Sequence, residues 1–293
     1  MEDTDTAQLR HRQREPWILA PTMPAGTITN RETRMSATAN AEFATRSSEQ
    51  EMDRRAKFLK TFQSSPIPAA ELVYSQLSLY LNRQELSRMF AMTELYRDHV
   101  LGTNGVLMEF GTCYGRTAAL LTNLRGMFEP FNFTRKLIVF DTFSGLAGTN
   151  EKDGNDRLAT DGAYSSGDGY ENHLEAVLSY HESEAPIAHR KKFEIVKGDG
   201  AKSINDYLAR HPETIVAMAY FDFDIYAPTK ACLEALRPHL TKSSVLAFDE
   251  LNCPEYPGET SALAEVFGLG KTSLKRSPFS PWMSYTTCES IVG

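Results

Sequence analysis

The sequence has few cysteines, and they lie far apart. Cys113, Cys232, Cys253 and Cys288 show neither a metal-ligand spacing nor short-range pairing. This pattern disfavours a zinc site or a disulfide framework and favours reduced thiols. An excess of positive charge is also missing, because 31 Lys and Arg stand against 38 Asp and Glu. The net charge of -7 argues against a nucleic acid or an anionic membrane as the main partner.

Long apolar runs are absent as well. No stretch reaches transmembrane length, and residues 1–16 lack the apolar centre of a secretory signal. Together with the reduced thiols, these absences favour a cytoplasmic protein. Residues 1–55 show no sustained apolar periodicity, so we predict a flexible N-terminal arm there.

Apolar periodicity begins near residue 68 and predicts two helices, which form a helical extension or cap over 56–104. Strands are predicted at 106–110, 136–140, 193–197, 216–223 and 244–248, and helices at 117–124, 170–182, 204–210, 228–240 and 259–267. Residues 272–275 and 284–287 flank a proline-containing turn and predict an antiparallel hairpin. Residues 105–293 are therefore predicted to form a doubly wound α/β domain with a mostly parallel, seven-stranded sheet.

Carboxylates gather where two of these predicted strands end. Asp222 and Asp224 close one strand, and Asp249 and Glu250 follow the next. Four carboxylates at neighbouring strand ends repel one another, and no Lys or Arg stands beside them in sequence. Oxygen ligands without His or Cys suit Mg²⁺ or Mn²⁺. The alternative is a set of solvated carboxylates at a sheet edge.

A glycine-containing turn follows the first predicted strand. Gly111 and Gly115 predict a tight turn at which a ligand can approach the start of a helix. Cys113 and Arg116 stand where a dinucleotide fingerprint requires glycine. Glu109, two residues before the first glycine, suits S-adenosylmethionine, which carries an ammonium group and has no pyrophosphate. Chance glycines at a strand–helix turn are the alternative.

Two further acids close the next predicted strands. Asp141 is placed to accept hydrogen bonds from ribose hydroxyls, and Asp199, within Gly198-Asp199-Gly200, is placed to meet an adenine amino group. Each acid can instead be a turn former or a helix cap. Acids at three successive strand ends, in the order that a nucleoside requires, favour a nucleoside-containing cofactor.

With these motifs the chain resembles the class I S-adenosylmethionine-dependent methyltransferases, and within them the metal-dependent sugar O-methyltransferases of the macrocin and mycinamicin type. The resemblance covers about 85–290 and includes Asp141-Thr142-Phe143-Ser144-Gly145-Leu146 and Asp222-x-Asp224-x-Tyr226. It implies Asp222, Asp249 and Glu250 as metal ligands and Asp224 as the general base. The family usually has Asp-Asp where this chain has Asp249-Glu250.

The resemblance also implies a cofactor site at the strand ends and the turns after them. Its residues are Glu109, Gly111, Thr112, Gly115, Arg116, Thr117, Asp141, Thr142, Phe143, Gly198, Asp199, Gly200 and Asp222. Residues 147–170, rich in Gly, Asp and Ser, are too many for a simple β-to-α connection. We predict a lid over the acceptor there, in which Tyr164 and Tyr170 stack on a sugar, with Tyr226 as a further acceptor contact. A floppy insertion is the alternative.

These observations predict an S-adenosylmethionine- and Mg²⁺-dependent O-methyltransferase that acts on a hydroxyl of a sugar or a glycosylated natural product. A catechol-type, metal-dependent O-methyltransferase is an alternative, because a vicinal diol on a ring chelates the same cation. A non-catalytic nucleotide-binding interaction protein is another. The expected partner is a small, sugar-containing molecule, with no nucleic acid and no membrane, and the chain is expected to form a homo-oligomer, namely a dimer.

Overall fold

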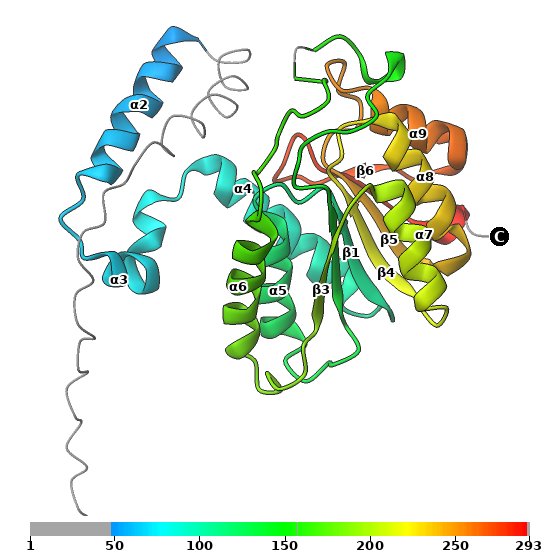
Figure 1. Cartoon of the computed structure of the whole chain (residues 1–293), viewed down its shortest axis with the longest axis horizontal. Helices are drawn as coiled ribbons and strands as arrows, with labels where there is room; N and C mark the ends of the chain where they lie inside the picture. Colours follow the sequence, from blue (N-terminus) through cyan, green and yellow to red (C-terminus); the bar gives the residue numbers. More distant parts are fainter. Residues whose placement is uncertain (1–47, 157, 292–293) are drawn as a thin grey trace, which may run out of the picture.

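The computed structural model describes residues 48–156 and 158–291, which leaves most of the predicted N-terminal arm outside the described residues. A seven-stranded sheet forms the centre of the molecule, and helices cover both of its faces (Figure 1). The strand order is β3-β2-β1-β4-β5-β7-β6. β1 to β5 pair in parallel, whereas β7 pairs antiparallel with β5 and β6.

The observed elements follow the predicted alternation closely. The strands are β1 (Val106–Phe110), β2 (Leu137–Asp141), β3 (Phe193–Lys197), β4 (Val216–Phe221), β5 (Leu240–Phe248), β6 (Lys275–Arg276) and β7 (Ser284–Thr287). The helices of the body are α4 (Arg83–Leu95), α5 (Arg116–Phe128), α6 (Tyr170–Ser183), α7 (Gly200–Arg210), α8 (Tyr226–Leu236) and α9 (Gly258–Val266). The doubly wound fold and the C-terminal hairpin are confirmed.

Alternation along the strands builds one core on each face of the sheet. In β1, Leu107 faces the core that includes α4, α5 and α6, while Met108 and Phe110 face the core of α7, α8 and α9. The Phe110 ring stacks between Phe140 of β2 and Phe221 of β4, with ring centroids 4.9 and 4.8 Å apart. These rings hold the carboxyl ends of three strands together, where the polar residues of the site begin.

The helical extension has two parts that pack differently. α2 (Glu49–Gln63), α3 (Ala69–Glu71) and the helical turns from Leu72 to Tyr80 contain no buried residue and stand away from the sheet (Figure 1). α4 instead packs into the sheet core through Met92 and Leu95. A domain boundary near residue 104 therefore cuts through a shared core.

α2 begins inside the segment predicted as a flexible arm. The Ser48 hydroxyl accepts the Glu51 N–H, and the Glu51 carboxylate accepts the Ser48 N–H at 2.8 Å, which forms a capping box. Residues 49–55 of the predicted arm are therefore helical, because this local capping signal starts a helix without strong apolar periodicity. Across 48–156 and 158–291, no helix is long and apolar enough to cross a membrane.

Candidate active site

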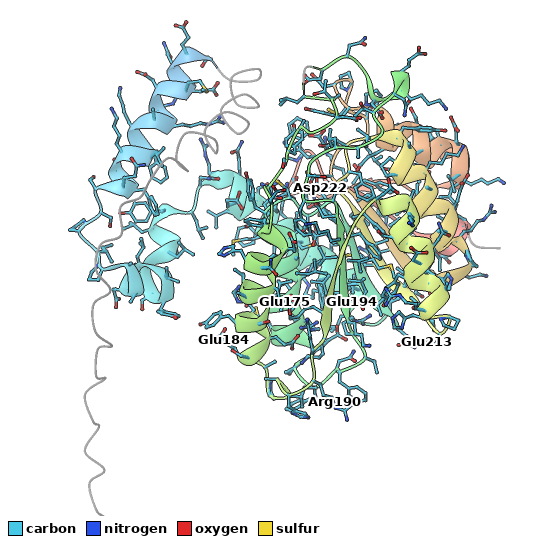
Figure 2. The ribbon with its side chains drawn as sticks, viewed as in Figure 1. Glu175, Glu184, Arg190, Glu194, Glu213 and Asp222 are labelled. Carbon is cyan, nitrogen blue, oxygen red and sulfur yellow. The ribbon has the colours of Figure 1, made fainter. Side chains whose placement is uncertain are left out.

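A cavity of about 320 Å³ opens at the carboxyl ends of the parallel strands. It lies at the ends of β1 and β4, where the strand order reverses and where doubly wound sheets bind their ligands. Figure 2 shows Asp222 at this end of the sheet and Arg190 at the opposite end. The cavity has the size of a small-molecule site.

Most of the predicted site residues line this cavity. They are Gly111, Thr112, Arg116, Thr117, Asp141, Thr142, Tyr164, Asp199, Gly200, Asp222, Asp224, Asp249 and Glu250. Others that were predicted are absent from the lining among the described residues, namely Glu109, Gly115, Phe143, Gly198, Tyr170 and Tyr226. The structure therefore brings the predicted cofactor, metal and base residues to one place.

The two glycines of the turn after β1 serve different purposes. Gly111 has a φ of +84°, and a Cβ there would lie 2.0 Å from the Asp222 carbonyl oxygen. Only glycine allows β1 and β4 to end this close together. At Gly115, which precedes α5, a Cβ would lie 2.2 Å from the Leu174 side chain. Gly115, whose φ is +82°, therefore forms the turn before α5 close to α6 and is not part of the cavity wall.

Asp141 organises the turns around the cavity. Its Oδ2 accepts the N–H groups of Thr112 and Cys113 at 2.6 and 2.8 Å, and its Oδ1 accepts the Phe143 N–H at 2.6 Å. A carboxylate has about four acceptor positions, so these bonds leave one for a ligand. The predicted contact with a ribose hydroxyl is thus compatible with a carboxylate that also ties β1 to β2.

Glu109 lies beneath the glycine turn and is buried. The Thr112 hydroxyl donates to its Oε1 at 2.9 Å, whereas Oε2 has no hydrogen-bond partner within the described part of the chain. Burial, followed by the charges of Asp222 and Asp141, raises the pKa of Glu109 to about 8. Because Glu109 is not in the cavity lining, its predicted contact with the cofactor stays a prediction.

Asp199 combines the two roles considered for it. Its carboxylate accepts the Lys202 N–H at 2.9 Å and so caps α7, and it also lines the cavity. The neighbouring Gly200 allows close packing, because a Cβ there would lie 2.5 Å from the Phe223 ring. Asp199 is therefore a helix cap, as the alternative interpretation held, and its place in the cavity lining is also compatible with the predicted ligand contact.

The carboxylate cluster reaches the cavity by a turn rather than by strand alternation. β4 ends at Phe221, two residues earlier than predicted, and Asp224 adopts a φ of +62°. Burial, followed by the charge of Asp249, raises the pKa of Asp222 well above its ordinary value. Burial and the charges of Asp222 and Glu250 raise the pKa of Asp224 in the same direction.

A positive partner that the sequence did not reveal lies beside this cluster. Arg88 of α4 places Nη2 3.2 Å from Asp249 Oδ2 and donates from Nη1 to the Tyr220 hydroxyl at 3.0 Å. Tyr220 in turn donates to Asp249 Oδ1 at 2.7 Å. Both oxygens of Asp249 are thus bonded within the protein. No Lys or Arg stands beside the cluster in sequence, and the fold brings Arg88 to it from 161 residues away.

Two more buried carboxylates, which the sequence did not single out, adjoin the cluster. Glu259 of α9 and Asp153 of the predicted lid are at most 1% exposed. Burial, followed by the charges of Asp222, Asp249 and Glu250, raises the pKa of Glu259 well above its ordinary value. Within the described residues, no group of three or more His, Cys, Asp or Glu side chains is arranged to hold a metal ion.

The predicted lid tyrosines occupy different places. The Tyr164 hydroxyl lies 2.9 Å from the Tyr256 hydroxyl, and Tyr164 lines the cavity. Tyr170 begins α6, and its hydroxyl donates to the Tyr114 carbonyl at 3.0 Å. Tyr226 donates to the Glu265 carboxylate of α9 at 2.6 Å. The Tyr226 side chain therefore takes part in the packing between α8 and α9, and its predicted contact with the acceptor stays a prediction.

Comparisons with known proteins identify relatives of this chain. No family model and no curated protein matches it. Among solved structures, the calicheamicin methyltransferase CalS11 is 40% identical, with a TM-score of 0.79 over 82% of this chain and 93% of that one. The apo structure of CalS11, described as a TDP-rhamnose 3'-O-methyltransferase of calicheamicin biosynthesis, is 38% identical, with a TM-score of 0.72 over 82% and 95%. The O-methyltransferase NovP shares the fold, at 17% identity and a TM-score of 0.52 over 69% and 79%.

Proposed function

Because this chain belongs to the class I S-adenosylmethionine-dependent sugar O-methyltransferases, we propose that it methylates a sugar hydroxyl in a reaction that requires Mg²⁺ or Mn²⁺. One observation carries the proposal: a single cavity is lined both by the predicted cofactor turn and by the carboxylate cluster. The identity with CalS11 favours a nucleotide-linked deoxysugar as the acceptor.

The cofactor site fits S-adenosylmethionine. Gly111 lets β1 and β4 end close together at the cavity wall, and Asp141 keeps one acceptor position for a ribose hydroxyl. The sulfonium of S-adenosylmethionine supplies an activated methyl group. The protein therefore mainly aligns the acceptor oxygen with that methyl group, an effect that is worth about 7–11 kcal/mol in well-oriented reactions.

Asp224 is the proposed general base. It is half-buried and lines the cavity, and burial and the charges of Asp222 and Glu250 raise its pKa. A carboxylate with a raised pKa accepts a proton more readily than an ordinary aspartate does. In this role, Asp224 removes the proton of the acceptor hydroxyl as the oxygen attacks.

We propose that the oxygen-only donors of the cluster bind a hard divalent cation, which must draw them together because the described side chains are not arranged around one. Asp222, Asp249 and Glu250 line the same cavity with oxygen atoms alone, and burial and the charge of Asp249 raise the pKa of Asp222. Such a cation would lower the pKa of a coordinated sugar hydroxyl. Arg88 already pairs with Asp249, so we propose that Asp249 serves both Arg88 and the cation through its remaining lone pairs.

The test is methyl transfer from labelled S-adenosylmethionine to a panel of acceptors, after removal of metal by a chelator. The panel contains nucleotide-linked deoxysugars, glycosylated natural products and catechols. Turnover of a sugar that stops in chelator and returns with Mg²⁺ supports the proposal. Turnover of catechols alone moves the function to the catechol class, and full turnover in excess chelator refutes the metal role. Asp224→Asn should lower kcat by about two to four orders of magnitude, the usual worth of a general base.

We also propose that the chain forms a homo-oligomer through the helices that precede α4. Their apolar side chains stay exposed: Leu59 is 54%, Val73 60%, Tyr74 71% and Leu79 62% exposed. Large apolar side chains that are concentrated in one segment and left exposed are typical of a protein–protein contact. The charges of α2 suit an antiparallel pairing with a second copy, because Glu49, Glu51 and Asp53 precede Arg54, Arg55, Lys57 and Lys60.

A further inference from the structure

Asp224 has a backbone conformation that no hydrogen bond of the sheet stabilises. Its φ of +62° lies in the left-handed region, which few residues other than glycine adopt. The last sheet-type hydrogen bond on this side is donated by the Asp222 N–H to the Phe110 carbonyl at 2.8 Å. Other groups must therefore hold the chain from residue 223 to the start of α8.

Two buried carboxylates accept backbone N–H groups on either side of Asp224. Glu259 Oε1 accepts the Phe223 N–H at 3.2 Å, and Asp153 Oδ1 accepts the Tyr226 N–H at 2.5 Å. Glu259 is 0% exposed and Asp153 is 1% exposed, so water does not compete for these bonds. We call this pair of carboxylates the clamp.

Asp153 provides the cap that α8 lacks. Ile225, at the N-cap position, has no side chain able to bond the free N–H groups of the first turn. The Asp153 carboxylate takes that role and places a negative charge at the helix N-terminus. Its other oxygen accepts the Asn150 N–H at 2.7 Å, which fixes a turn of the predicted lid against α8.

The first turn of α9 completes the arrangement. A Cβ at Gly258 would lie 2.6 Å from both Asp153 Oδ1 and the Tyr226 nitrogen, so α9 packs directly on the bond between them. The next residue, Glu259, extends to the Phe223 N–H. The clamp thus brings the lid turn, α8 and α9 together around one aspartate.

We infer that Asp153 and Glu259 are positioning residues that hold Asp224 in the orientation needed to accept the acceptor proton. The inference rests on the proposed function of Asp224. It follows that placement of the lid turn at Asn150–Asp153 and placement of the base are coupled through the Tyr226 N–H.

Kinetics and hydrogen exchange on the full chain test the inference. Asp153→Ala and Glu259→Ala should each lower kcat by about tenfold and leave the Kd of S-adenosylmethionine within about threefold, because each acts through the base. Glu259→Gln keeps an acceptor oxygen and should retain most of the turnover. Glu184→Ala is the matched control, because this exposed carboxylate at the far end of α6 accepts the Tyr180 hydroxyl, away from the cavity, and should behave as wild type.

A double-mutant cycle separates positioning from general damage. In the Asp224→Asn background, loss of Asp153 or Glu259 should lower kcat by less than about twofold further, because the group that they position is already inactive. Fully additive losses, or losses that come from weaker cofactor binding, overturn the clamp. So does wild-type turnover of both alanine variants when Asp224→Asn is inactive, and that result leaves the proposed function intact.

Hydrogen exchange gives a readout that does not depend on turnover. The amides of Phe223 and Tyr226 should exchange at least about tenfold faster in Glu259→Ala and Asp153→Ala, respectively, because each loses its buried acceptor. Unchanged exchange of both amides refutes the clamp even if no acceptor is found. Faster exchange without methyl transfer to any panel sugar would instead count against the proposed function alone.

Discussion

Gly111→Ala tests the close approach between the ends of β1 and β4. A Cβ at this position would lie 2.0 Å from the Asp222 carbonyl oxygen, whereas ordinary contact begins at 3.4 Å, so the Asp222 peptide must move by the difference, 1.4 Å. That shift breaks the bond from the Asp222 N–H to the Phe110 carbonyl, which is 2.8 Å long. It also displaces a carboxylate that lines the cavity.

The expected loss of folding stability in Gly111→Ala has two parts. A left-handed backbone costs an alanine about 1–2 kcal/mol, and loss of the hydrogen bond costs about 1 kcal/mol. The sum is about 2–3 kcal/mol, which for a domain of this size lowers Tm by roughly 4–12 °C. Because Asp222 moves, affinity for S-adenosylmethionine should fall by at least about tenfold, or 1.4 kcal/mol.

Gly148→Ala is the matched control. Gly148 has the same φ of +84°, but no atom lies within 4 Å of the position that a Cβ would take, so its alanine variant carries the backbone strain without the clash. Thermal unfolding and calorimetric titration are measured for both variants. The difference between them gives the effect of the clash with Asp222 alone. If Gly111→Ala unfolds at the temperature of Gly148→Ala and binds the cofactor as wild type does, the reasoning is refuted.

Further predictions concern the charges and the exposed helices. Burial and Asp249 raise the pKa of Asp222 above its unfolded value, so the folded state binds more protons between the two pKa values and its stability falls as pH rises through that window. Asp222→Asn should therefore raise the Tm of the chelator-treated protein at pH 8 and leave it unchanged near pH 3, and an equal effect at both pH values would contradict this. Arg88→Met leaves buried Asp249 without its ionic partner and should cost about 3–5 kcal/mol in urea denaturation, part of which Mg²⁺ restores; an unchanged midpoint without metal would count against the pair. Leu59→Glu combined with Leu79→Glu should shift the molar mass from light scattering to that of a monomer, and an unaltered mass would exclude these helices as the oligomer contact.

The fold could be predicted because the spacing of apolar residues differs between strands and helices and is visible within each element. Buried parallel strands are short apolar runs, and amphipathic helices repeat every 3.6 residues, so the order of elements is visible without knowledge of tertiary contacts. The strand-end acids Asp141, Asp199 and Asp249 were also visible, because each lies at the end of a strand or within two residues of it, and the strand is recognised locally. All three line the cavity.

What the sequence did not reveal depends on contacts between distant residues. Arg88 meets Asp249 across 161 positions, and Tyr226 finds its partner Glu265 on another helix. Asp224 was expected to share a strand face with Asp222, but its left-handed backbone ends the alternation. Aspartate tolerates that conformation without a glycine to signal it, so no periodicity could have shown the turn.

The ion pair between Arg88 and Asp249 limits how this enzyme can be recombined with its relatives. Arg88 comes from α4 and Asp249 from the end of β5, so a chimaera joined near residue 104 takes the two charges from different parents. A parent without the matching partner would leave a buried charge uncompensated. A junction before Arg83 keeps α4 with the sheet that it packs on, and only the exposed helices are exchanged. The segment that must be exchanged as one unit therefore begins at α4, before the first strand of the sheet.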